Sequence, residues 1–334
     1  MIGWLKITSE ERKEILGLIS NRTGLPAYAI EKDWWVTLTL YAIFRTRWKD
    51  NLVFKGGTSL SKSWNLIERF SEDIDLVVDR SVLGFAEELS KTKIKELRRA
   101  SCAFTSGPFR DELEAELIKI GVSEEMFGLK VAEATESDRD PQILELHYIS
   151  SLEKGNYLNE AVLIEIGARS LREPSEQREI NSIISSSLGD TETAGEAFSI
   201  LTVTPVRTFL EKIFLLHEEF SKPVEKIRTD RMSRHLYDID RIMDTTYGKQ
   251  AVQDTELYNA IVDHRSKFNI IRGIDYKTHA PELVNFIPPI AILAAWEADY
   301  KAMQIDMFYA DSKPFAIIID RMNQLTERFR ALKK

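Results

Sequence analysis

The spacing of apolar positions predicts a mixed first part and a helical second part. Apolar residues recur at helical spacing through Ser9–Phe44 and, among more charges, through Phe85–Ile120. Short apolar runs bounded by polar turns predict strands at Leu52–Phe54, Ile74–Val78, Ile143–Ile149 and Ala161–Ile166. A helix is predicted between the first two strands, over Ser59–Phe70. The chain therefore contains a strand, glycine turn, helix, strand unit near its start.

Helical spacing dominates after residue 200. Helices are predicted at Pro205–Glu219 with Thr204 as N-cap, at Arg231–Thr245, after Pro288 and after Pro314. The stretch Ser182–Glu196 is rich in Ser, Thr and Gly and marks a boundary. We expect an α+β protein, with a mixed-sheet domain at 1–200 and a helical domain at 201–334.

Composition and charge narrow the class of protein. Of 334 residues, 43% are hydrophobic and 29% charged, as in an ordinary globular protein, and the net charge of −8 argues against a protein that coats nucleic acid. A single cysteine, Cys102, permits no internal disulfide, and the histidines show no zinc spacing. Met1–Gly17 lacks the apolar core of a signal peptide, so we expect a cytoplasmic protein without a membrane partner.

A glycine turn is the first candidate for chemistry. Lys55, Gly56 and Gly57 follow a predicted strand, and Thr58 and Ser59 open the next helix. Backbone amides of such a turn suit an anionic phosphate, and the two hydroxyls add donors. The Walker spacing G-x-x-x-x-G-K-[ST] is absent, so this is a different phosphate site. Alone, a Gly-Gly pair is most often only a turn.

A pair of aspartates is the second candidate. On a strand, Asp73 and Asp75 point to the same face while Ile74 and Leu76 point to the core. Two such carboxylates repel by about 4 kcal/mol at an effective dielectric near 20, and a divalent cation such as Mg²⁺ reverses this repulsion. A solvated strand surface is the alternative explanation. A phosphate turn followed by a metal-binding D-x-D nevertheless indicates nucleotidyl transfer.

Two-metal transfer usually draws on a third carboxylate. Glu165, between Ile164 and Ile166, is one candidate, because an acid inside an apolar strand is costly unless it is paired or metal-bound. Glu145, on the preceding predicted strand, is the rival, and an edge-strand glutamate facing water is the alternative for both.

These motifs resemble the AbiEii/AbiGii toxin family. The resemblance lies in Lys55–Leu60 and Arg69–Leu76, with weaker similarity at Ile30–Val36, Glu211–Ile213 and Arg234–Ile239. Family members are DNA polymerase β-like nucleotidyltransferases, the toxins of type IV toxin–antitoxin and phage-abortive systems. The resemblance implies an Mg²⁺-dependent enzyme that uses a nucleoside triphosphate and has a cognate antitoxin. It also favours Glu165, because it places the family's second motif on such an I-E-I strand.

The resemblance also implies roles for individual residues. Asp73, Asp75 and Glu165 would hold two metal ions, while Lys55, Gly56, Gly57, Thr58 and Ser59 grip the phosphates. Ser71 and Lys212 would contact the phosphates from other sides, and Asp238 would orient Lys212 or the acceptor. A surface lysine on an amphipathic helix remains the alternative for Lys212. His235 departs from the family, since relatives often carry aspartate there.

The acceptor implied by the family is an RNA, with the tRNA 3′ end as the expected site. Basic residues at Lys91–Arg99 and Lys226–Arg234 are candidates for contacting its backbone, although charge runs usually form solvated faces. We expect the backbone at Lys226–Arg234, which lies nearer the proposed site in sequence and contains fewer acids. Two alternatives stay open. The protein could transfer the nucleotide to a protein hydroxyl, including its own, or it could be a non-catalytic nucleotide-binding module of a defence system.

Overall fold

The computed structural model describes residues 1–85, 89–133, 140–152, 161–189, 191–269, 271 and 273–332. A turn expected at Glu153–Asn156 lies outside these residues. The described chain divides into two compact units, Met1–Ser63 with Ser71–Val203, and Trp64–Phe70 with Thr204–Lys334. The sequence-based division at residue 200 assigns Trp64–Phe70 to the first domain, whereas the structure groups this segment with the C-terminal helices.

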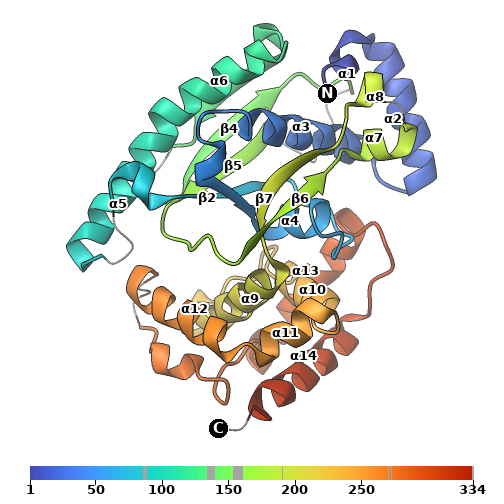
Figure 1. Ribbon diagram of the computed structural model, residues 1–334. Coiled ribbons are helices and arrows are strands. Elements are labelled where there is room, and N and C mark those ends of the chain that lie inside the picture. Colours follow the sequence, from blue (N-terminus) through green and yellow to red (C-terminus); the bar gives the residue numbers. More distant parts are fainter. Residues whose placement is uncertain are drawn as a thin grey trace. The chain divides into compact units, whose positions relative to one another are not determined.

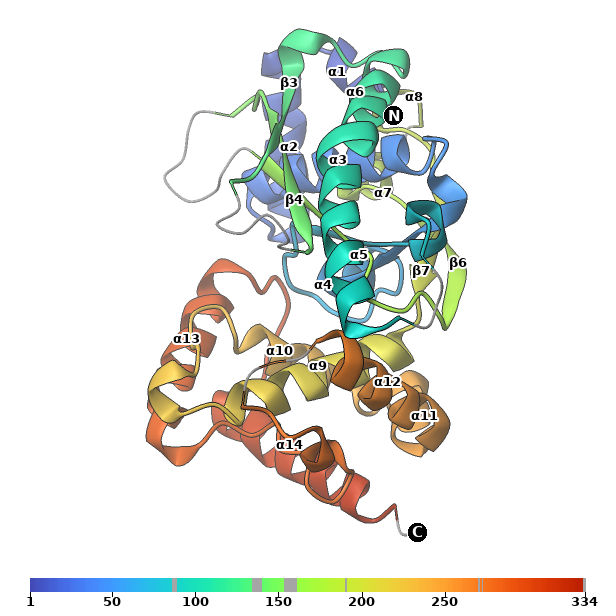
Figure 2. The same ribbon diagram turned by 90° about the vertical axis from the view of Figure 1, so that its left-hand side faces the viewer.

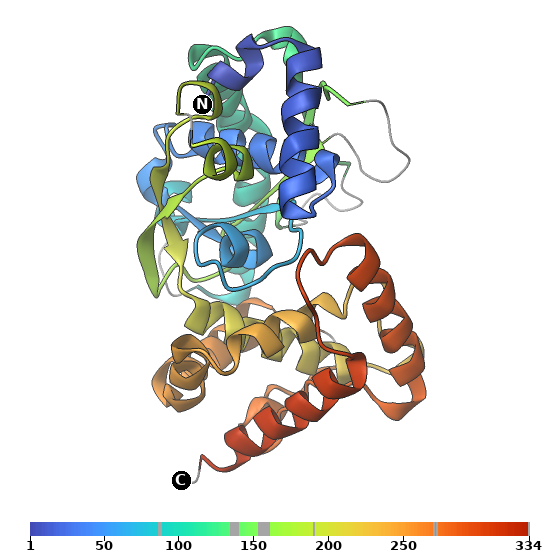
Figure 3. The same ribbon diagram turned by 90° about the vertical axis from the view of Figure 1, so that its right-hand side faces the viewer.

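The first unit is built on a seven-stranded mixed sheet in the order β3-β4-β5-β2-β1-β7-β6. Its strands are β1 (Leu52–Lys55), β2 (Ile74–Val78), β3 (Phe127–Val131), β4 (Gln142–Tyr148), β5 (Ala161–Gly167), β6 (Ser175–Ile180) and β7 (Phe198–Val203). β2 runs antiparallel to β1 and parallel to β5. Figure 2 shows β3 and β4 at one edge, and Figure 3 shows β6 beside β7 at the other. The α+β class with a mixed sheet is confirmed.

The first unit contains eight described helices, of which α3, α4 and α5 contact strands of the sheet (Figure 1). The eight are α1 (Gly3–Lys6), α2 (Ser9–Thr23), α3 (Ala27–Ile43), α4 (Gly56–Lys62), α5 (Lys91–Phe104), α6 (Arg110–Lys119), α7 (Ile183–Leu188) and α8 (Thr191–Ala194). α3 contacts α2, α6, α7 and β5, and Trp35 stacks on Tyr148 of β4 with ring centroids 4.9 Å apart. Trp34 and Trp35 are core residues, as expected from their place in an apolar helix.

The predicted helix Ser59–Phe70 is wrong in its second half. α4 ends at Lys62, and Asn65 has a positive φ of 51°, which a helix does not accommodate. The following residues are held by other contacts of the second unit, since Arg69 bridges to Phe308 and the Phe70 amide donates to the Met307 carbonyl. Tertiary pairing therefore overrides the helical spacing of Ile67 and Phe70.

The second unit is helical. It contains α9 (Pro205–Phe220), α10 (Arg234–Ile242), α11 (Thr246–Gln253), α12 (Thr255–Phe268), α13 (Leu293–Asp306) and α14 (Phe315–Arg330). α9 contacts α10, α11 and α12, and every α9 residue except Glu211 and Leu215 is buried. Thr204 stands at the N-cap position of α9, but its side chain makes no capping hydrogen bond. The helix is instead set by Pro205 at its first position.

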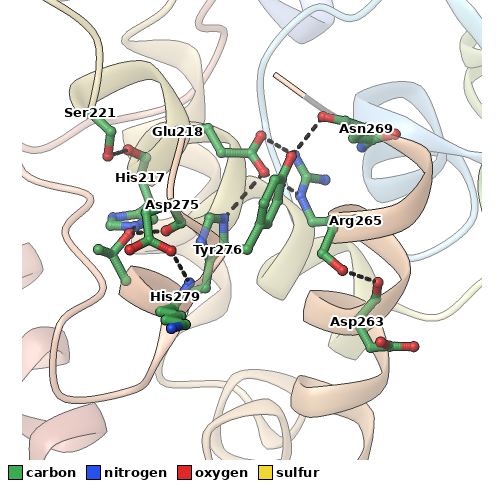
Figure 4. A network of polar contacts seen from close by, with 12 residues as sticks. His217, Glu218, Ser221, Asp263, Arg265, Asn269, Asp275, Tyr276 and His279 are labelled. Atoms are coloured by element: carbon green, nitrogen blue, oxygen red, sulfur yellow. Dashed lines mark hydrogen bonds and ion pairs between the residues drawn. The ribbon is translucent and has the colours of Figure 1, made fainter. Parts of the chain in front are cut away.

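A buried polar network joins α9 to later segments of this unit (Figure 4). Arg265 of α12 donates to Glu218 through Nε at 2.8 Å and through Nη2, and His279 Nε2 lies 3.2 Å from Glu218 Oε1. The neighbouring His217 accepts from the Asn285 amide through Nδ1, at 3.0 Å, and lies 2.9 Å from the Thr278 hydroxyl through Nε2. Since Thr278 donates its own proton to Asp275, the Nε2–H tautomer of His217 satisfies every partner.

Candidate active site

The glycine turn and the D-x-D strand meet at Gly56. β1 ends at Lys55 and α4 begins at Gly56, whose φ is +80°. A Cβ placed on Gly56 would lie 1.8 Å from Asp75 Oδ2, so no side chain fits between the turn and this carboxylate. Glycine is required here both by the backbone angle and by the close approach. The sequence predicted that the glycines allow a ligand to approach this backbone closely. In the structure, the Asp75 carboxylate also lies against it.

Three charged side chains form a row across adjacent strands. Lys55 of β1 is paired with Asp75 of β2, and Asp75 is paired with Glu165 of β5. Directly paired residues share a face of the sheet, with neighbouring strands about 4.8 Å apart. The row therefore places a cation and two carboxylates side by side on one face.

Asp73 lies on the same face as Asp75, as predicted. Strand β2 begins only at Ile74, but the alternation of burial continues upstream. Ser71, Asp73 and Asp75 are half-buried, whereas Glu72 and Ile74 are buried. The face with Asp73 and Asp75 is thus open in part, and the opposite face is in the core.

Hydroxyl groups hold the glycine turn against this strand. Thr58 Oγ1 donates to the Asp73 carbonyl at 2.5 Å and lies 2.9 Å from Ser71 Oγ, while Ser59 Oγ donates to the Gly56 carbonyl at 2.9 Å. Thr58 and Ser59 are buried, with exposed fractions of 1% and 0%. These two hydroxyls brace the turn in this structure, which leaves the amides of Gly56 and Gly57, with Lys55 and Ser71, as the more open donors for a phosphate.

The two candidates for a third carboxylate differ in their surroundings. Glu165 is the lateral neighbour of Asp75, whereas Glu145 is paired with Leu163 and so lies one strand farther from β2. Glu145 Oε2 is also 2.9 Å from His147 Nε2. This arrangement favours Glu165, and its role as a ligand stays a prediction.

The donor set fits Mg²⁺. Among the described residues, no group of three His, Cys, Asp or Glu side chains stands ready to enclose a metal ion. Mg²⁺ is usually held by one or two carboxylates together with substrate phosphates and water rather than by a closed protein cage. Asp73, Asp75 and Glu165 offer hard oxygen ligands beside a turn suited to phosphates, which is the arrangement that this mode of binding needs.

Lys212 and Asp238 are brought together in the second unit. Lys212 Nζ lies 2.8 Å from Asp238 Oδ2, and Arg69 binds the same carboxylate through Nε at 2.7 Å and Nη2 at 2.8 Å. Lys212 is 7% exposed, so it is not the surface lysine of the alternative interpretation. Arg69 stood within the resembling segment but carried no predicted role; a lone arginine between Glu68 and Phe70 gives no signal of burial.

The charges in this cluster shift one another. Burial alone would raise the pKa of Asp238, but the charges of Arg69 and Lys212 outweigh it and hold that pKa well below its usual value. Burial lowers the pKa of Lys212, and the charge of Asp238 opposes this only in part. His235 is also buried, and burial together with Lys212 lowers its pKa well below the ordinary value. The residue that departs from the family is therefore a neutral imidazole.

The remaining basic candidates have partners in the structure. Arg207 Nε donates to Glu211 at 2.9 Å, and Arg228 donates to Glu219 at 2.8 Å. Asp240 is bonded to Lys313 at 2.7 Å and to Arg321. On α5, Lys91, Lys95 and Arg99 are exposed.

A helix-opening glycine turn beside paired carboxylates on a mixed sheet is the arrangement expected of a nucleotidyltransferase. Comparison with protein families bears this out, since the model described as "Nucleotidyl transferase AbiEii toxin, Type IV TA system" matches residues 38–332. The chain belongs to this family of type IV toxin–antitoxin nucleotidyltransferases. A search of curated proteins finds no match.

Family membership confirms the enzyme class that the sequence predicted. A nucleotide substrate and a cognate antitoxin follow from the same membership. It argues against the alternative of a non-catalytic nucleotide-binding module. In the described part of the chain, no helix combines the length and the apolar character needed to cross a bilayer.

Proposed function

We propose that the protein is an Mg²⁺-dependent toxin that transfers a nucleoside monophosphate from a nucleoside triphosphate to an RNA, with the tRNA 3′ end as acceptor. The observation that carries the proposal is the contact of the glycine turn with strand β2, which carries Asp75: Gly56 leaves no room for a side chain next to Asp75, and Asp75 adjoins Glu165. Phosphate donors and carboxylates thus face the same small region. We place the reaction in the cytoplasm, where nucleoside triphosphates and tRNA are both present.

The reaction joins an acceptor hydroxyl oxygen to the α-phosphorus of the nucleotide. The bond from that phosphorus to the oxygen bridging to the β-phosphate breaks, pyrophosphate leaves, and the hydroxyl proton passes to solvent. The amides of Gly56 and Gly57 and the Lys55 ammonium, which donates to Ser170 Oγ at 3.0 Å, would bind the leaving phosphates, on which charge develops as the bond breaks. Thr58 and Ser59 hold the turn in place through their hydrogen bonds to the carbonyls of Asp73 and Gly56.

Asp73, Asp75 and Glu165 would hold Mg²⁺, which when bound neutralises phosphate charge and activates the acceptor hydroxyl. Glu165 would serve the ion nearer that hydroxyl. Lys212 would contact the phosphates, the role that the family resemblance implies, and its bond to Asp238 gives it a fixed orientation. The exposed cations Lys91, Lys95 and Arg99 of α5 support an RNA acceptor, because RNA binding draws on phosphate contacts.

Incubation with each α-³²P-labelled nucleoside triphosphate, Mg²⁺ and total tRNA tests the proposal, with Asp73→Ala/Asp75→Ala as control. We expect label on tRNA with the wild type only. Label on protein alone would replace the RNA acceptor by a protein hydroxyl. Label on neither, with intact folding, would contradict transfer to either class of acceptor.

A further inference from the structure

Helix α3 carries three consecutive charged residues that are all buried. Glu31, Lys32 and Asp33 have exposed fractions of 1%, 3% and 9%. A charge removed from water is costly unless it is paired and hydrogen-bonded. Three in succession on one helix therefore need an explanation beyond the stability of the core.

Each of the three side chains holds a different segment of the first unit. Glu31 accepts hydrogen bonds from the Ser150 hydroxyl at 2.5 Å and the Ser151 amide at 2.7 Å. Lys32 Nζ lies 2.5 Å from Glu72 Oε2. Asp33 accepts from Lys62 Nζ at 2.5 Å and from the Ile183 amide at 2.8 Å.

Lys62 and Glu72 lie next to Ser63 and Ser71, the residues at which the chain leaves the first unit and returns to it. Lys62 ends α4, Glu72 precedes Asp73, and Trp64–Phe70 between them belongs to the second unit. We call the two ion pairs Lys32–Glu72 and Asp33–Lys62 the stem clamp. Its charges alternate, so exchanging the partners would set lysine against lysine and carboxylate against carboxylate. Lys62 can therefore pair only with Asp33, and Glu72 only with Lys32, on α3.

The Glu72 side of the clamp fixes which residues face the site. Glu72 is buried together with Ile74, whereas Ser71, Asp73 and Asp75 are half-buried. Because the side-chain period of an extended chain is two, a slip by one residue would turn the aspartates into the core and Ile74 outward. Only one register allows the Glu72 carboxylate to meet Lys32 on the buried side.

Buried ion pairs contribute little net stability compared with apolar residues of the same size, and their best-attested use is to specify a register. We propose that Lys32, acting through Glu72, is a positioning residue that sets the register of Asp73 and Asp75 and thereby the metal affinity of the active site. The inference rests on the proposed function, since it takes these aspartates as the metal ligands. Lys32 itself touches neither the metal nor the substrate.

Binding of Mn²⁺ to the full-length protein, followed by electron paramagnetic resonance, tests this role without relying on turnover. Lys32→Met keeps the length of the side chain and removes its charge. Lys62→Met is the matched control, because it breaks the other buried ion pair of the stem clamp. The partner of Lys62 in that pair, Asp33, lies on α3 next to Lys32. Thermal unfolding of both variants measures the structural cost, and Asp73→Asn identifies the metal site.

We expect Lys32→Met to weaken Mn²⁺ binding by about 10-fold or more, the usual effect of losing a residue that orients a metal ligand. Lys62→Met should lose a similar amount of thermal stability and bind Mn²⁺ within about twofold of the wild type. Glu72→Gln should resemble Lys32→Met, because it removes the other half of the same pair.

The outcomes separate the two proposals. If Asp73→Asn abolishes Mn²⁺ binding but Lys32→Met binds like Lys62→Met, the positioning role is wrong and the metal site stands. If the wild type binds no Mn²⁺, or Asp73→Asn binds as the wild type does, both the metal site and the role of Lys32 are overturned.

Discussion

At Gly56 two constraints act on a single residue, the space beside Asp75 and the backbone angle. A methyl group at this position would occupy the space of the Asp75 carboxylate, and the φ of +80° disfavours every other L residue. Gly56→Ala should therefore displace Asp75 and reduce transfer by at least about 100-fold, because misplaced catalytic groups of this kind carry such a cost.

The measurement for Gly56→Ala is the initial rate of label transfer at saturating Mg²⁺. Gly84→Ala is a matched control, since Gly84 also has a φ of +80° but a Cβ there would meet nothing within 4 Å. A Gly56→Ala protein that is folded and as active as Gly84→Ala would show that the turn can move away from the strand without loss.

His217 carries a pH dependence that can be assigned to one residue. Burial, together with the smaller effect of the nearby His279, lowers the pKa of His217 from its usual 6.5 to about 4. Between these two values the unfolded chain binds a proton and the folded one does not, so the free energy of unfolding falls as the pH falls. The whole shift corresponds to roughly 3 kcal/mol.

Urea unfolding at pH 7 and pH 5 measures this effect. His217→Gln retains an acceptor and a donor but does not titrate, so its stability should fall less between the two pH values than that of the wild type. An equal fall in both proteins would assign the acid sensitivity to other groups, of which Glu218 is the nearest carboxylate.

Individual residues of the candidate site could be predicted where the residue type itself is unusual for its position in the sequence. Asp73, Asp75 and the glycines stand out because acids and glycines are unusual beside apolar strand residues. The internal hydrogen bonds of Thr58 and Ser59, and the place of Arg69 against Asp238, depend on partners distant in sequence. No local pattern encodes those contacts, so the sequence could not supply them.

Among the elements, β1, β2, β4 and β5 were predicted within a residue or two because each is a clear apolar run. β3, β6 and β7 were not predicted. β6 (SEQREI) is polar and mostly exposed at an edge of the sheet, so it lacks the apolar run on which the prediction relies. The Pro-initiated helices α9 and α14 agreed with prediction, since proline fixes a helix start through its own backbone angle.

The Asp238 carboxylate of α10 pairs with Lys212 of α9 and with Arg69. Variants of this cluster can separate an effect on stability from an effect on transfer. Asp238→Asn would leave Arg69 and Lys212 buried without their counter-charge, so we expect a loss of about 3–5 kcal/mol in the free energy of unfolding. Lys212→Met leaves Asp238 paired with Arg69 and should cost much less stability.

Denaturant unfolding and transfer assays on the same preparations check this pair of variants. If Lys212 contacts the phosphates, Lys212→Met should stay folded and lose transfer, whereas Asp238→Asn should lose both. A folded Lys212→Met protein with wild-type transfer would leave the lysine a purely structural role.

On the scale of the whole molecule, the second unit is discontinuous in sequence, because it contains Trp64–Phe70 as well as Thr204–Lys334. Trp64, Ile67 and Arg69, which are 6%, 2% and 3% exposed, are counted with the C-terminal helices although they lie between α4 and β2. A chain of residues 1–203 would carry these three side chains without the rest of their unit. Replacing all three with serine should make this fragment markedly more soluble.

Size-exclusion chromatography of the two fragments at equal concentration tests this expectation. We expect the unaltered fragment to elute partly as aggregate and the serine variant as a monomer. Equal monomer content in both would mean that the exposed segment buries itself within the sheet-containing unit.

The discontinuous second unit also bears on how such a gene can evolve. Recombination at the boundary near residue 203 would bring in new helices but keep the old Trp64–Phe70, including an arginine whose carboxylate partner had changed. A successful exchange needs a second, matching replacement far upstream, between the glycine turn and the aspartate pair. The sheet and the helices are therefore expected to be inherited together, as one module, rather than shuffled among unrelated toxins.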